Sequence, residues 1–135
     1  MSRILIVDDS DAELEFMATV LRASGHEIEM ASDGAQALVR FEDFQPDLVI
    51  TDIYMPECDG IELILQLRRR RSQVPVIAVS GGCAREQGVL LNMMPQLGAD
   101  LALAKPLSTG VLTTAVKSLL SVRAASGTQT DQIHD

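Results

Sequence analysis

The sequence is poor in aromatic residues, with no tryptophan, one tyrosine and three phenylalanines among 135 residues, although 47% of it is hydrophobic. Its core must therefore be built from aliphatic side chains. A chain of this length can bury such a core without disulfides or a structural metal. The length is also typical of a single domain.

Cysteine is scarce as well, since Cys58 and Cys83 are the only two. Two cysteines make no disulfide framework, and no CxxC or His/Cys spacing typical of a metal site occurs. Reduced thiols in the cytoplasm are the simplest interpretation. The N-terminus lacks the basic and apolar regions of a signal peptide, and no apolar run is long enough to span a bilayer. We therefore expect a cytoplasmic protein without a membrane partner.

Positive charge is in deficit: 11 Lys and Arg face 19 Asp and Glu, which gives a formal net charge of -8. Nonspecific nucleic-acid binding needs a basic face that contacts the phosphates. An anionic membrane surface makes the same demand. The acidic balance therefore argues against both kinds of partner.

Short apolar runs alternate with longer stretches of helical period. Five expected strands are Arg3–Val7, Glu27–Ala31, Leu48–Thr51, Val74–Ser80 and Leu101–Ala104. Helical patterns follow each of them, including 85–97 and a last helix over Thr109–Val122. Five such units predict an α/β domain over residues 1–123, a doubly wound parallel sheet with five helices on its two faces. The small, polar tail 124–135 is expected to be disordered.

Two adjacent acids, Asp8 and Asp9, follow the first expected strand directly. One of them can cap the next helix, because Asp is a favoured N-cap residue. Capping does not explain two acids, and Ser10 and Asp11 can cap as well. Since adjacent carboxylates repel, the alternative is a cation above the end of the strand.

Polar side chains also stand at the ends of three further strands: Asp52, Ser80 and Lys105. Each alone is ordinary, because Asp is common in loops, Ser caps helices and Lys is usually solvated. Ligands bind beyond the carboxyl ends of parallel strands, however, so all of these residues share one edge with Asp8 and Asp9. Oxygen ligands favour a hard ion such as Mg²⁺, which also takes waters and phosphate oxygens. Asp52 can then act as a nucleophile towards phosphorus.

Four motifs occur in order, "ILIVDD", "DLVITDIYMPECDGIEL", "VPVIAVSG" and "KP". In them the chain resembles the receiver domain of two-component response regulators from residue 3 to about residue 122. The resemblance implies a flavodoxin-like sheet of order 2-1-3-4-5. It implies that Asp52 is the phosphoacceptor and that Ser80 and Lys105 contact the phosphoryl group. The implied donor is a phosphohistidine on a histidine kinase or a phosphotransfer protein.

The same resemblance implies a set of metal ligands. Asp9 would bind Mg²⁺ directly and Asp8 more through water, together with the phosphoacceptor Asp52. The backbone carbonyl of Tyr54 would be a further ligand. By the same resemblance a cis peptide bond is expected between Lys105 and Pro106, and X–Pro bonds adopt this form at little cost.

We therefore expect a single-domain receiver without an output domain. It would catalyse only its own phosphorylation and dephosphorylation, and would switch the binding of a partner or relay phosphate. The rival is an aspartyl-phosphate phosphatase on a similar sheet, which typically has a second Asp two residues after the nucleophile. Tyr54 occupies that position. A flavin-binding module would need a phosphate-cradling first loop, where the Asp8–Asp9 pair repels phosphate.

Two features depart from the family pattern. Ala102 stands three residues before Lys105, where the family usually has an aromatic residue that turns inward on phosphorylation. The stretch before the last strand is also a few residues longer than usual. We therefore expect the output change to be a rearrangement of Gly81–Leu97 instead.

Overall fold

The computed structural model describes residues 2–53, 59–70, 72–81, 93 and 96–134. Five strands make one parallel sheet in the order β2-β1-β3-β4-β5. They are β1 (Arg3–Val7), β2 (Glu27–Ala31), β3 (Leu48–Asp52), β4 (Val76–Ser80) and β5 (Leu101–Ala104). The predicted fold class and strand order are confirmed.

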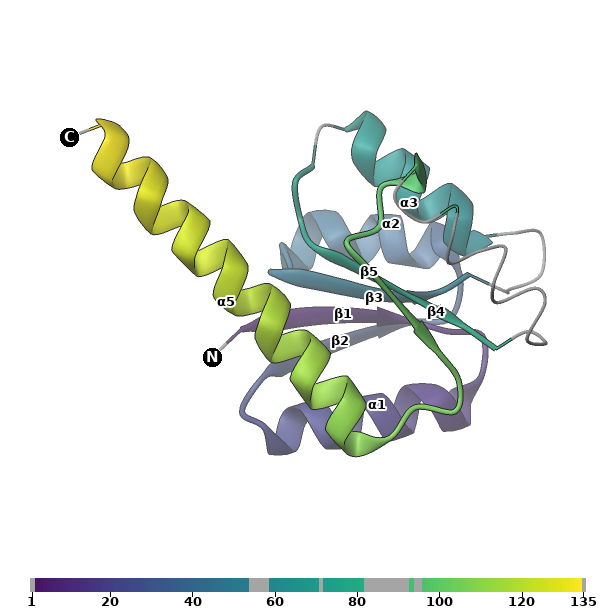
Figure 1. Ribbon diagram of the computed structural model, residues 1–135. Helices are drawn as coiled ribbons and strands as arrows, with labels where there is room; N and C mark the ends of the chain where they lie inside the picture. The colour runs from purple at the N-terminus through teal and green to yellow at the C-terminus, as the bar shows by residue number, and fades with distance from the viewer. Residues whose placement is uncertain (1, 54–58, 71, 82–92, 94–95, 135) are drawn as a thin grey trace.

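Helices cover both faces of the sheet (Figure 1). They are α1 (Asp11–Ala23), α2 (Gly34–Phe44), α3 (Asp59–Arg69) and α5 (Thr109–His134). Helices α2 and α3 pack on one face, and α1 and α5 pack on the other. The helix expected over 85–97 lies mostly outside the described residues.

The core has two halves because successive strand residues point to opposite faces. Leu5 and Val49 pack beneath α2 and α3, while Ile4, Leu48 and Ile50 pack against α1 and α5. All five side chains are fully buried. A parallel sheet covered on both faces requires such continuous aliphatic strands, so the runs seen in the sequence are explained by burial on two sides.

Strand β4 begins at Val76, two residues later than the predicted Val74. The Arg68 guanidinium accounts for this difference: its Nη1 donates to the backbone carbonyls of Ser72 and Val74, both at 2.9 Å. The Val74 carbonyl is thus bound by a side chain at the entrance to the strand. Arg68 also bonds the Gly98 carbonyl at 2.7 Å, which ties this entrance to the turn before β5.

Helix α5 continues to His134, beyond the end near Val122 that the hydrophobic period predicted. No proline follows Thr109, so no residue removes a helical N–H or forces a break. In Figure 1 the second half of α5 extends away from the sheet. The expected disorder of 124–135 in solution stays a prediction, as does the domain limit at 123.

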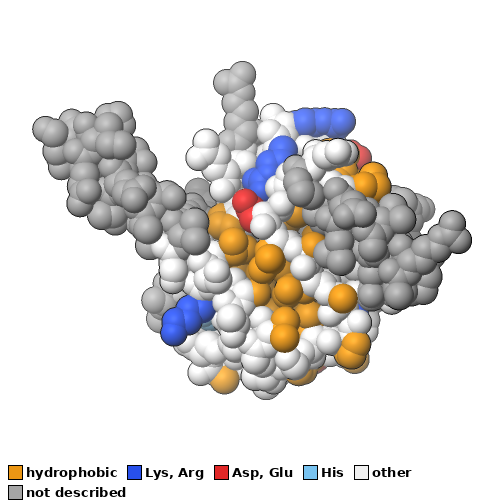
Figure 2. All heavy atoms as spheres, viewed as in Figure 1, with side chains coloured by type: hydrophobic (Ala, Val, Ile, Leu, Met, Phe, Trp, Pro, Cys, Tyr) orange, Lys and Arg blue, Asp and Glu red, His pale blue; other side chains and the backbone are white. Residues whose placement is uncertain are grey.

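The edge formed by β5 and α5 presents apolar surface. Leu101 and Leu103 of β5 line a groove of about 660 Å³ with Val111 and Ala115 of α5. Figure 2 shows hydrophobic side chains gathered near the middle of the face on which β5 and α5 lie. In the described part of the chain, no helix combines the length and the apolar content that a bilayer span needs.

Candidate functional site

The carboxyl ends of β1, β3, β4 and β5 meet at one edge of the sheet. Asp8 and Asp9 follow β1, Asp52 is the last residue of β3, and Ser80 is the last residue of β4. Lys105 follows β5 directly, and its backbone N–H donates to the Ser80 carbonyl at 2.8 Å. The structure therefore brings together all the described residues that the sequence predicted for the site.

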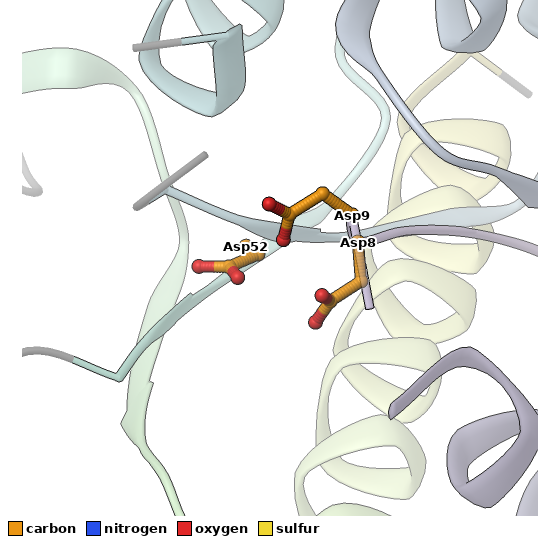
Figure 3. A group of neighbouring side chains, drawn as sticks. All are labelled: Asp8, Asp9 and Asp52. Atoms are coloured by element: carbon orange, nitrogen blue, oxygen red, sulfur yellow. The ribbon is translucent and has the colours of Figure 1, made fainter. Parts of the chain in front are cut away.

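Three carboxylates converge at this edge (Figure 3). One ligand oxygen from each of Asp8, Asp9 and Asp52 lies within 4.8 Å of the other two. Asp8 is fully buried and Asp52 is 4% exposed, whereas Asp9 is open to solvent. Such crowding of like charges is costly unless a cation lies among them.

Helix capping does not account for the two adjacent acids. The N-cap of α1 is Ser10, whose Oγ accepts the backbone N–H of Glu13 at 3.4 Å. Asp8 instead accepts the Ser10 N–H through Oδ1 at 2.9 Å, which holds its side chain beside the site. The cation alternative is therefore favoured for Asp8 and Asp9.

Lys105 supplies one positive charge within the cluster. Its Nζ donates to Oδ2 of Asp8 at 3.0 Å and to Oδ2 of Asp52 at 3.1 Å, and its side chain is 17% exposed. Burial disfavours the charged ammonium, but the hydrogen bonds to both carboxylates and their attraction outweigh burial. The pKa of Lys105 is therefore raised above its ordinary value of 10.5.

This raised pKa predicts a stability change in alkaline solution. The charged Lys105 contributes fully below its unfolded pKa of 10.5, and the contribution is lost as the pH rises through the higher folded value. In thermal unfolding, the wild type should lose stability as the pH rises above 10.5. Lys105→Met should lose less stability over the same pH range. Lys117→Met, at an exposed position, serves as the control and should keep the wild-type profile. Identical profiles for Lys105→Met and wild type would contradict the prediction.

Ser80 lies beside the phosphoacceptor candidate. It is 4% exposed, and the preceding Val79 pairs with Asp52 across β4 and β3. The predicted cis bond between Lys105 and Pro106 is confirmed. Tyr54, the further metal ligand that the resemblance implies, lies outside the described residues.

Gly60 lies at a close backbone contact beside the site that the sequence did not reveal. It is buried at the start of α3, and a Cβ placed on it would lie 1.9 Å from the Asp52 carbonyl oxygen. Helix α3 can therefore approach the end of β3 only because this residue has no side chain. The available signal was the glycine one residue after Asp59, at the start of an expected helix.

The strand order 2-1-3-4-5, with its polar groups at the carboxyl edge, defines the class as a flavodoxin-like α/β domain. Residues 4–117 match the family of response regulator receiver domains. The chain belongs to this family, and the resemblance drawn from its motifs is confirmed.

Two transcriptional regulatory proteins are similar to this chain over most of its length. The transcriptional regulatory protein PrrA of Mycobacterium leprae is 35% identical over 130 residues, which cover 96% of this chain and 54% of PrrA. PhoP of Bacillus subtilis, the alkaline phosphatase synthesis transcriptional regulatory protein, is 33% identical over 118 residues, which cover 87% of this chain and 48% of PhoP. The chain thus spans about half the length of these relatives.

Solved structures agree with this assignment. A CheY-like receiver domain protein from Methanospirillum hungatei superimposes with a TM-score of 0.83 at 29% identity, covering 93% of this chain and 98% of that one. The chemotaxis protein CheY4 of Vibrio cholerae gives a TM-score of 0.78 at 26% identity, covering 87% and 98%. The described fold is therefore that of the CheY-like receivers.

Proposed function

We propose that this chain accepts a phosphoryl group on Asp52 from a histidine kinase or a phosphotransfer protein, in the presence of Mg²⁺. The phosphorylated form then switches the binding of a partner protein or relays the phosphate. The observation that carries this proposal is the placement of the buried Asp52 carboxylate. It lies within 4.8 Å of two further carboxylates and 3.1 Å from an ammonium.

The donor atoms fit Mg²⁺. Among the described residues, the potential metal ligands at this edge are the carboxylate oxygens of Asp8, Asp9 and Asp52, without a histidine or a thiol. Mg²⁺ binds through a few carboxylates and keeps positions for waters and phosphate oxygens. Asp8, Asp9 and Asp52 would hold the ion, with the Tyr54 carbonyl as a further ligand. When bound, Mg²⁺ supplies positive charge that stabilises the transferring phosphoryl group.

The transfer itself is a displacement at phosphorus. A carboxylate oxygen of Asp52 forms a bond to phosphorus while the bond from phosphorus to the donor's imidazole nitrogen breaks, and its electron pair leaves with the imidazole. Lys105 Nζ donates to Oδ2 of Asp52 at 3.1 Å beforehand and then attracts the phosphoryl oxygens. The Ser80 hydroxyl donates a hydrogen bond to the same group. Because Asp52 is itself modified, the chain is a signalling phosphoacceptor and not an enzyme for a separate substrate.

We further propose that the direct partners of this chain are proteins in the cytoplasm. PhoP and PrrA are transcriptional regulatory proteins by name, but this chain spans only about half of each. Its net charge of -8 provides no excess of positive charge for contacts with the phosphates of a nucleic acid. We assign to it the phosphoacceptor function alone, without a membrane or nucleic-acid contact of its own.

Incubation with Mg²⁺ and acetyl phosphate, followed by intact-mass measurement, tests the proposed function. We expect the addition of one phosphoryl group, and no addition when Mg²⁺ is removed with a chelator. The phosphatase alternative predicts continued release of inorganic phosphate from phosphate monoesters with multiple turnover. Failure to gain mass in the presence of Mg²⁺ would refute the phosphoacceptor proposal.

A further inference from the structure

Lys105 reaches the acids from across the sheet. It follows β5, whereas Asp52 ends β3 and Asp8 follows β1, and the strands run in the order β1-β3-β4-β5. Neighbouring strands lie about 4.8 Å apart. The Lys105 side chain must therefore cross the end of β4 before its ammonium can meet Asp8 and Asp52, which it contacts at 3.0 and 3.1 Å.

Gly81 lies where this crossing takes place, directly after the last residue of β4. A Cβ placed on Gly81 would lie 3.1 Å from Cδ of Lys105, and 3.9 Å from both its Cβ and its Cγ. The aliphatic stem of Lys105 therefore lies against the side of Gly81 from which a side chain would project. Gly110 offers a contrast, because a Cβ there would meet no atom within 4 Å.

Backbone conformation does not explain the glycine. Gly25 and Gly98 have φ angles of 93° and 97°, which few other residues adopt. Gly81 is not among the described glycines with positive φ. A positive φ is therefore not the reason for this glycine, and the space above it is what a substitution would change.

We propose that Gly81 is a positioning residue for Lys105. Because Gly81 has no side chain, the aliphatic stem of Lys105 has room to cross the end of β4. The ammonium can then bridge the acids that follow β1 and end β3. The role in phosphoryl transfer rests on the proposed function of Asp52. The placement of Lys105 itself does not, and the two can be tested apart.

Competitive amine labelling tests the placement in unphosphorylated protein. The chain has only two lysines, so exposed Lys117 is an internal standard for Lys105. In the wild type, limiting formaldehyde and a borohydride reductant should methylate Lys105 much more slowly than Lys117. Gly81→Val removes at least one charge-assisted hydrogen bond of Lys105. Loss of such a bond exposes the ammonium, so the Lys105 to Lys117 ratio should rise about tenfold or more.

Two variants bracket this result. Gly81→Ala places its Cβ 3.1 Å from a flexible stem and should raise the ratio less than Gly81→Val does. Gly110→Val, the matched control in open space, should leave the ratio unchanged. A ratio that stays at the wild-type value in Gly81→Val would overturn the proposal, as would an equal rise in Gly110→Val.

A double-mutant cycle tests the consequence for phosphorylation by acetyl phosphate and Mg²⁺. Gly81→Val should slow the reaction about tenfold in the chain that has Lys105, because a positioned charge is lost. In the Lys105→Met background it should slow the reaction little, since no ammonium remains to be displaced. Equal slowing in both backgrounds would mean that the added isopropyl group obstructs the donor, and would overturn the role through Lys105. A wild type that accepts no phosphoryl group contradicts the proposed function, while the labelling result still decides the placement.

Discussion

Asp52→Asn should abolish the phosphoryl mass gain that wild type shows with Mg²⁺ and acetyl phosphate. The amide keeps the size of the carboxylate and can still hydrogen-bond, but it lacks the charge that makes the oxygen a nucleophile towards phosphorus. It also removes one of three carboxylates that lie within 4.8 Å of one another. The variant should therefore remain folded, so that its loss of labelling reports chemistry and not unfolding.

Asp43→Asn is the matched control, because Asp43 is an exposed acid on α2 away from the cluster. It should be labelled at the wild-type rate. Peptide mapping of the labelled wild type should place the phosphoryl group on Asp52 alone. If Asp52→Asn gains the same mass at the same yield, the phosphoacceptor is another residue and the assignment made here is wrong.

The site was predictable from the sequence to the extent that it depends on one rule of parallel sheets. Because all carboxyl ends lie at one edge, Asp8, Asp52 and Ser80 could be grouped from their positions after apolar runs. The pairing of Lys105 with two specific carboxylates was not predictable, since it depends on which strands separate the lysine from the acids. Residue order along the chain does not contain those distances.

Other features were hidden from the sequence for different physical reasons. Strand β4 starts late because Arg68, from a helix, binds the Val74 carbonyl, a contact with no local signature. Helix α5 extends past Val122, although the hydrophobic period ends there. The period of apolar residues shows only which part of a helix is buried, and the helix itself can continue beyond its buried part. Ala102 was visible as a departure, and it is half-buried in β5 opposite Ala78. The predicted rearrangement of Gly81–Leu97 lies mostly outside the described residues and stays a prediction.

Gly60→Ala should be the most disruptive single methyl group that can be added near the site. The new Cβ would lie 1.9 Å from the Asp52 carbonyl oxygen and 2.6 Å from Cα of Ile53, and both atoms belong to buried backbone. Neither can move aside as a side chain does, so α3 or the end of β3 must shift. Overpacking of this kind costs about 1–3 kcal/mol in the free energy of unfolding.

The shift should also impair phosphorylation, because it moves the residue that carries the nucleophile. A displacement of about 1 Å can cost about a hundredfold in rate, and we expect a loss of that order for Gly60→Ala with acetyl phosphate and Mg²⁺.

Gly110→Ala is a close control, since Gly60 and Gly110 are the second residues of α3 and α5. Alanine exceeds glycine in helix propensity by up to about 1 kcal/mol, and nothing lies within 4 Å of a Cβ at Gly110. The control should therefore unfold at the wild-type temperature or above and keep the wild-type rate. If urea unfolding and labelling rates of Gly60→Ala match those of Gly110→Ala, the close approach of α3 to Asp52 does not position the phosphoacceptor.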